Sequence, residues 1–262
     1  MNITHSKNVF IYGVCGRSSS TALQRILNSS DEIFIFGEHH QVIEKLVNCY
    51  FHFSEIDHER QAKEFKKLID SFENKLHTSF YANATNNMLP IQAEIKEVIL
   101  KLLQPPLPYS RIGYKEISVV DSLSLRKIQR FFPNSYFIFL FRNPLKQWGS
   151  VGYLKSFWDY SKSLDAFLRE YARVATIYLN TPINYSFFLE NTSIRDEDKM
   201  NQIIKMVEIE KFDSSLLGKT ISTTNKYKVS RLEKARIMSS KAFRLYQEMQ
   251  KQELQYRLYS ER

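Results

Sequence analysis

The feature that most constrains the fold is a series of short apolar segments that lack the alternation of a half-exposed strand. Between these segments, apolar residues recur at helical spacing. Strands that are apolar at successive positions and alternate with helices indicate a parallel sheet covered on both faces. The expected strands cover residues 8–14, 32–36, 111–114, 136–141 and 183–188, and the expected helices cover residues 39–53, 58–76, 90–103, 122–131, 144–155 and 162–179.

The length of 262 residues suits one α/β domain. No internal repeat, low-complexity tract or Gly/Ser linker interrupts the sequence, and "QPPLPYS" (104–110) is typical of a stiff connector. We therefore expect a single domain over residues 1–262, with three α/β/α layers around a central, mainly parallel, five-stranded sheet. A basic C-terminal helix over residues 231–262 is expected to pack on this domain or extend from it.

Composition favours a soluble protein. Hydrophobic residues make up 43% and charged residues 25% of the chain, as in ordinary globular proteins. No apolar run reaches eighteen residues, and the first residues lack the layout of a signal peptide. Two cysteines, Cys15 and Cys49, cannot make a disulfide framework, so the cytoplasm is the simplest location.

The net charge of +9 is concentrated near the C-terminus, where ten basic and four acidic residues lie between Lys226 and Arg262. Charge of this kind is compatible with a nucleic-acid surface, with an anionic small ligand, or with a helix that is merely basic and solvated. Charge alone does not choose among these three interpretations.

The first expected strand runs into "GRSSST" (residues 16–21), after which a helix begins. A helix N-terminus at the carboxyl edge of a parallel sheet favours anions, because its amides are unpaired and its dipole is positive there. Gly13 and Gly16 permit a tight turn, and Arg17 adds a positive charge. The hydroxyls can donate to phosphate oxygens or cap the helix, and these alternatives stay open; they belong to Ser18, Ser19, Ser20 and Thr21.

An ATP-type phosphate loop is disfavoured. That motif requires G-x-x-x-x-G-K-[ST], but Ile11 stands at the leading glycine position and Arg17 replaces the lysine. The strand at 136–141 continues into Arg142, so it offers no terminal aspartate for magnesium.

A second strand end, "RNPLKQWGS" (142–150), has a similar arrangement. Asn143 is a good helix cap and Pro144 suits the first helical position. Arg142 then lies at the strand tip and Ser150 about two turns into the helix. A guanidinium beside a hydroxyl is suited to a separate phosphate, although Arg142 could equally be a structural ion-pair partner.

Two anion sites at one edge suggest a nucleotide with phosphates at two ends, and the motifs resemble those of sulfotransferases that use 3′-phosphoadenosine-5′-phosphosulfate (PAPS). "GRSSST" is similar to their 5′-phosphosulfate loop, and "RNPLKQWGS" to their 3′-phosphate motif. The resemblance extends from about residue 9 to residue 236. It implies that Tyr185 in "INYSFF" contacts adenine and that the loop "STTNKYKVSR" (222–231) closes over the nucleotide with Ser222, Thr223 and Lys228.

Within the first loop, Ser19 occupies the position where the family usually has glycine. A serine is tolerated there without strain only if its φ is negative.

The resemblance also implies catalytic roles. Arg17 and Lys115, in "YKEI", would place positive charge at the sulfonate. The histidine of the cytosolic branch is absent after Lys115, whereas Glu38 lies 21 residues beyond Arg17, as in the bacterial and protein-tyrosine sulfotransferase branch with a glutamate base. We therefore expect Glu38 to be the general base. The alternatives are that Glu38 caps a helix beginning near His39, or that another group is the base: His39, His40 or Glu116.

These inferences predict a sulfotransferase that moves a sulfonate from PAPS to a hydroxyl of a small molecule, such as a bacterial natural product or glycoconjugate, and releases PAP. No metal, nucleic-acid or membrane partner is expected. The alternatives are peptide tyrosine sulfation, a P-loop-like nucleotide kinase, and a nucleic-acid-binding module. Residues 77–87 are a plausible acceptor lid. The aromatic residues that could line an acceptor pocket are Tyr50, Phe51, Phe53, Phe80, Tyr81, Trp148, Tyr153, Phe157, Trp158 and Tyr160.

Overall fold

The computed structural model describes residues 7–54, 63, 66, 89–107, 109–117, 119, 121–154, 157–219 and 227–255. The strands are β1 (Val9–Gly13), β2 (Ile33–Phe36), β3 (Arg111–Glu116), β4 (Tyr136–Phe141) and β5 (Ser186–Glu190). The helices are α1 (Ser20–Leu27), α2 (Val42–Ser54), α4 (Leu89–Leu102), α5 (Ser122–Phe131), α6 (Pro144–Val151), η3 (Asp159–Lys162), α7 (Leu164–Asn180), η4 (Ser193–Arg195), α8 (Glu197–Met206), η5 (Ser214–Leu216), α9 (Arg231–Ser239) and α10 (Lys241–Lys251).

The five strands form one sheet in the order β2-β3-β1-β4-β5, and every neighbouring pair is parallel. The predicted α/β class and five-stranded parallel sheet are therefore confirmed. Because the strands are parallel, their carboxyl ends share one edge and their amino ends share the other.

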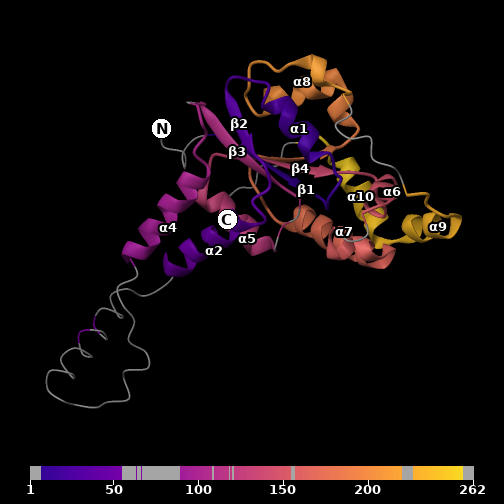
Figure 1. Ribbon diagram of the computed structural model, residues 1–262, viewed down its shortest axis with the longest axis horizontal. Coiled ribbons are helices and arrows are strands. Elements are labelled where there is room, and N and C mark those ends of the chain that lie inside the picture. The colour runs from indigo at the N-terminus through magenta and orange to yellow at the C-terminus, as the bar shows by residue number, and fades with distance from the viewer. Residues whose placement is uncertain are drawn as a thin grey trace, which may run out of the picture. The chain divides into compact units, whose positions relative to one another are not determined.

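Helices cover both faces of this sheet (Figure 1). On one face, Ile11 and Ile138 belong to a cluster with Leu23 of α1 and Ile203 of α8. On the other face, aromatic side chains pack ring to ring, as where Phe139 stacks on Tyr178 of α7 with centroids 4.6 Å apart. Nearly every strand residue is buried, which explains why the strand sequences lack alternation.

Several boundaries differ from the sequence prediction by two to four residues, and two of these differences have a clear backbone cause. The strand expected at 183–188 is β5, which begins at Ser186 because Tyr185 adopts a left-handed backbone with φ 53°. The helix expected from residue 39 begins at Val42, because His40 and Gln41 have φ of 51° and 64°. The helix expected at 58–76 lies outside the described residues, apart from Lys63 and Lys66.

The chain groups into two compact units: one comprises residues 1–41 and 103–262, and the other residues 42–102. The first holds the sheet, and the second holds α2 and α4. The single domain expected from the sequence stays a prediction. The basic C-terminal segment forms two helices, α9 and α10, because the hydroxyl of Ser240 accepts from the amide of Phe243 and caps a new helix.

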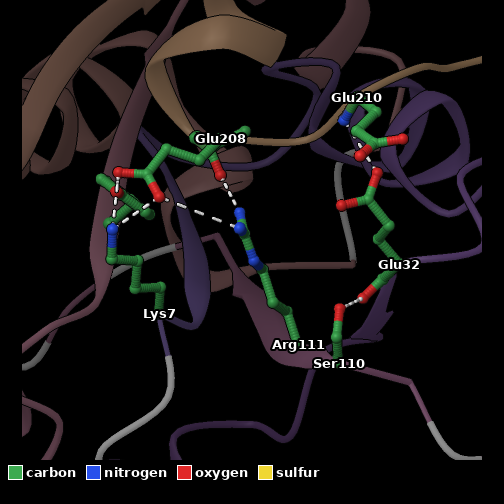
Figure 2. Close-up of polar contacts among 8 residues, drawn as sticks. Lys7, Glu32, Ser110, Arg111, Glu208 and Glu210 are labelled. Carbon is green, nitrogen blue, oxygen red and sulfur yellow. Dashed lines mark hydrogen bonds and ion pairs between the residues drawn. The ribbon is translucent and has the colours of Figure 1, made fainter.

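A polar network around Glu208 connects strand starts at the amino edge of the sheet (Figure 2). Lys7 Nζ lies 2.5 Å from Glu208 Oε2, Tyr136 donates to Glu208 Oε1 at 2.7 Å, and Arg111 Nη2 lies 3.9 Å from Oε2. These partners begin or precede strands β1, β4 and β3, so Glu208 links three strand starts to the end of α8.

Candidate active site

The loop between β1 and α1 has an unusual backbone. Cys15, Arg17 and Ser19 have φ of 62°, 66° and 79°, whereas Gly16 and Ser18 between them do not have positive φ. Such alternation turns successive amides toward one concave side, a geometry that binds anions. Ser19 therefore does not meet the condition of a negative φ, and its left-handed backbone costs about 1–2 kcal/mol. Strain of this kind persists where surrounding contacts impose it.

Two neighbouring elements supply those contacts. Gln147 of α6 donates from Nε2 to the carbonyls of Val14 (2.8 Å) and Gly16 (2.7 Å). The amide of Gly16 donates to Tyr160 Oη at 2.8 Å. A Cβ on Gly16 would lie 2.4–2.9 Å from the ring carbons of Trp158, so glycine is needed here for close approach of the indole.

The hydroxyls of the loop are not used as helix caps. Ser19 is the N-cap of α1 but makes no side-chain capping bond. Ser18 is fully buried, and its Oγ has no hydrogen-bond partner among the residues that the structure describes. Ser20 is buried and Thr21 is exposed. A buried hydroxyl without a partner is costly unless a ligand satisfies it. The structure therefore supports the anion interpretation of these hydroxyls over the capping interpretation.

The second predicted anion site lies against the first. Asn143 caps α6 by accepting from the amides of Leu145 and Lys146, which leaves Arg142 at the tip of β4. Arg142 Nη1 donates to the carbonyl of Arg17 at 3.0 Å, and Arg17 Nε donates to Ser150 Oγ at 3.1 Å. Arg17, Arg142 and Ser150, expected at neighbouring strand ends, are thus brought into direct contact.

This edge carries positive charge that is not neutralised within the described part of the chain. Arg142 is half-buried, and its Nε has no hydrogen-bond partner in the described ranges. Among the described residues, no carboxylate lies within 4.0 Å of Arg142 or of Arg195. Burial, and then the charges of Arg17 and Arg195, lower the pKa of the Arg142 guanidinium. Three arginines with this arrangement favour a multiply charged anion.

The two expected catalytic side chains at the sulfonate form an ion pair. Lys115, near the end of β3, is only 6% exposed at its side chain, and its Nζ donates to Glu38 Oε1 at 2.5 Å. Glu38 lies on the loop between β2 and α2, four residues before α2 begins at Val42. The pair places a carboxylate and an ammonium side by side at the carboxyl edge.

The other candidate bases differ in accessibility. Glu116 is 3% exposed and its Oε2 accepts from the amide of Gln41 at 2.9 Å; burial is the main cause that raises its pKa. His39 Nε2 is buried and has no hydrogen-bond partner within the described part of the chain, and burial lowers the pKa of this imidazole. His40 is exposed. Glu116 and the Nε2 atom of His39 are thus buried beside the loop that carries Glu38. The side chain of Glu38 itself is 29% exposed.

Tyr185 is not brought to this edge. It directly precedes β5, and its carbonyl accepts from the amide of Phe137 at the start of β4. The arginines follow the strands at their other ends, five residue steps or about 17 Å away. The adenine contact expected for Tyr185 is therefore corrected: this side chain lies at the amino edge of the sheet.

The late loop is described only from Tyr227 onward, so Ser222 and Thr223 lie outside the described residues. Tyr227 donates its amide to the carbonyl of Gly149 at 2.8 Å. This bond brings Lys228, which is exposed, to the part of α6 that carries Ser150.

Three residues of the site were missed by sequence reasoning, Gln147, Asn191 and Arg195, whereas Tyr160 was named only as one of the aromatic residues that could line an acceptor pocket. Asn191 Nδ2 lies 3.5 Å from Ser19 Oγ, and its Oδ1 is buried without a partner in the described part of the chain. Asn191 directly follows β5, so a correct end for that strand would have placed it at the edge. Tyr160 carried no signal beyond its aromatic character.

The chain belongs to the sulfotransferase family, since the family model matches residues 8–185, more than half of the chain. No curated protein matches it. A solved sulfotransferase from Alicyclobacillus acidocaldarius has a similar fold, with 11% identity, a TM-score of 0.50, and coverage of 89% of this chain and 90% of that chain. The sulfotransferase domain of the Synechococcus PCC 7002 olefin synthase is 17% identical, with a TM-score of 0.48 and coverage of 97% and 92%.

Among the described residues, no group of three or more His, Cys, Asp or Glu side chains is arranged to hold a metal ion. None of the described helices is both long and apolar enough to cross a membrane.

Proposed function

We propose that this sulfotransferase moves the sulfonate of PAPS to a hydroxyl of a small molecule and releases PAP. The observation that carries the proposal is the half-buried guanidinium of Arg142, which has Arg17 and Arg195 for neighbours and no carboxylate within 4.0 Å among the described residues. An uncompensated charge of this kind lowers stability. A phosphate group from a ligand would compensate it.

The donor's two phosphate ends match the two contacting anion loops. Arg142 and Ser150, with Lys228 from the late loop, would hold the 3′-phosphate. The loop from Gly16 to Thr21 would hold the 5′-phosphosulfate through the amides of residues 17–21 and the side chain of Arg17, and the Ser18 hydroxyl, which has no partner among the described residues, would donate to one of its oxygens. Ser19, Ser20 and Thr21 are proposed for the same group, and Ser222 and Thr223 for the nucleotide, on the family resemblance.

In the transfer, a bond forms between the acceptor oxygen and sulfur, and the bond between sulfur and the phosphate oxygen breaks. The electron pair stays on the phosphate of PAP, and the acceptor's proton moves to Glu38. Lys115, 2.5 Å from Glu38, would place positive charge at the oxygens that gain negative charge. Glu38 is proposed as the base because it is the more exposed of the two carboxylates beside Lys115.

A thermal-shift panel of PAP, PAPS, ATP and AMP tests the donor. At about 100 times its dissociation constant, a specific ligand stabilises the folded state by roughly 2.7 kcal/mol. We expect PAP and PAPS to raise the melting temperature, and AMP to have little effect because it lacks the 3′-phosphate that Arg142 would bind. Equal shifts with ATP and PAP would contradict the proposal and favour a kinase.

The base is tested with Glu38→Gln. This variant should keep its affinity for PAP and lose 10²- to 10⁴-fold in the rate of PAP release from PAPS, measured with a panel of phenols, sugars and alcohols. Glu32→Gln at the amino edge is the matched control and should keep the wild-type rate. Normal turnover by Glu38→Gln would move the base to a histidine of the same loop.

A further inference from the structure

One hydroxyl at the site is assigned no role above. Tyr160 belongs to η3, and its Oη accepts the amide hydrogen of Gly16, in the middle of the anion loop, at 2.8 Å. The phenol therefore lies beside the backbone that is proposed to hold the phosphosulfate.

The position of Tyr160 is rigidly fixed. Its ring stacks on Trp158 with centroids 5.5 Å apart and planes 8° apart, and Trp158 in turn packs on Gly16. The Ser161 hydroxyl bonds to the carbonyls of Leu154 (2.8 Å) and Trp158 (2.7 Å), which closes the turn. A group held in place by packing and by neighbouring hydrogen bonds is suited to catalysis, because little reorganisation is needed.

The hydroxyl of Tyr160 has a proton to donate. As an acceptor it is occupied by Gly16, but no acceptor for its own hydrogen is present among the described residues. Burial is the main cause that raises the pKa of this phenol, and the nearby charge of Glu38 raises it further. Tyr160 therefore stays neutral.

We propose that Tyr160 is a further catalytic residue, whose hydroxyl donates a hydrogen bond to the sulfonate as it is transferred. The sulfonate would lie between the loop amides and the Glu38–Lys115 pair, and Tyr160 is a neutral donor that contacts the first of these groups at Gly16. A neutral donor stabilises the negative oxygens without repelling the arginines beside it. This inference rests on the proposed function.

The test compares two ligands that differ only in the sulfonate. Tyr160→Phe should weaken binding of PAPS about tenfold by isothermal titration calorimetry, while the dissociation constant of PAP stays within twofold of wild type. The rate of PAP release from PAPS should fall 10²- to 10³-fold, the usual loss when an oxyanion donor is removed. Tyr185→Phe, at the amino edge, is the matched control and should change neither affinity nor rate.

Each other outcome has a distinct meaning. If Tyr160→Phe weakens PAP and PAPS equally, the hydroxyl only supports Gly16 and the inference is wrong; if neither affinity nor rate changes, it is also wrong. Failure of the wild-type protein to bind PAP would instead overturn the proposed function.

Discussion

The two edges of the sheet differ in whether their charged side chains are paired with opposite charges. At the amino edge, Glu208 lies 2.5 Å from Lys7 and within ion-pair distance of Arg111, so opposite charges are paired (Figure 2). At the carboxyl edge, Arg142 has only arginines as charged neighbours among the described residues. Pairing stabilises the fold, whereas like charges gathered together lower its stability and are useful only with an anion bound.

Backbone strain does not distinguish the edges. Tyr185 and Glu208 at the amino edge have φ of 53° and 55°, close to the 66° of Arg17 in the anion loop. Strained residues cluster at functional sites, but here they also mark ordinary turns. The pairing of charges is therefore the better guide to function in this molecule.

The largest expected effect comes from Arg142→Ala. Removing charge-assisted hydrogen bonds to phosphate should cost about 2.7 kcal/mol of binding, a roughly 100-fold increase in the Kd for PAP. Folding stability should change by no more than about 1 kcal/mol, because a desolvated charge without a counter-ion is removed together with one bond to the Arg17 carbonyl. Calorimetry with PAP and urea denaturation measure the two quantities.

The matched variant at the other edge is Arg111→Ala. It should lower stability, because Arg111 bonds to the carbonyl of Val207 and pairs with Glu208, and it should leave the Kd for PAP unchanged. If both arginine variants changed binding and stability alike, the contrast between the edges would be false.

A smaller effect is expected from Glu116→Ala. Glu116 accepts from the amide of Gln41 on the strained loop that carries Glu38, so it is a positioning residue. The kcat should fall about tenfold as Glu38 is less well oriented, with the KM for PAPS and the Kd for PAP unchanged. Glu116→Gln keeps an acceptor oxygen and should recover part of the rate. A parallel loss of PAP affinity would indicate a general disruption of the edge.

The architecture was predictable from sequence because burial on both faces leaves a simple pattern. "YFIFLF" is apolar at every position, and β4 has the expected bounds of Tyr136–Phe141. The boundaries that failed depend on single backbone angles. Neither Tyr185 nor Gln41 is a residue type that favours a left-handed conformation. Tertiary hydrogen bonds impose it, such as the bond from the Gln41 amide to Glu116.

The site was predictable where a residue lies next to a strand end in the sequence. Arg17, Arg142 and Lys115 follow or end correctly located strands, and parallel pairing brings them together. Tyr160 and Gln147 reach the loop through tertiary packing of η3 and α6, for which spacing carries no signal. Tyr185 was misplaced because the strand was expected over residues 183–188, whereas β5 begins only at Ser186.

At the amino edge, Glu208→Gln should lower stability by about 0.5–1 kcal/mol at pH 7, since Glu208 is 46% exposed and solvent screens its ion pairs. The hydrogen bond from Lys7, followed by that from Tyr136, lowers the pKa of Glu208 below its ordinary value of 4.5. The stabilisation is therefore fully present above pH 4.5 and is lost as the pH falls through the lowered pKa. Urea denaturation of both proteins between pH 3 and 7 checks this. A difference that grew toward acid pH would contradict the pairing.

The smallest effect concerns Ser19, whose φ of 79° suits glycine. Ser19→Gly relieves about 1–2 kcal/mol of backbone strain but adds about 0.5–1 kcal/mol of unfolded-state entropy, so it should stabilise by about 0.5 kcal/mol. Ser19→Ala removes the same hydroxyl and keeps the strain. The two variants should therefore bind PAP alike and differ only in urea midpoint, with glycine the higher. Equal midpoints would mean that the loop relaxes without cost, and the anion-binding amides would then lack the rigid arrangement that separates this edge from the other.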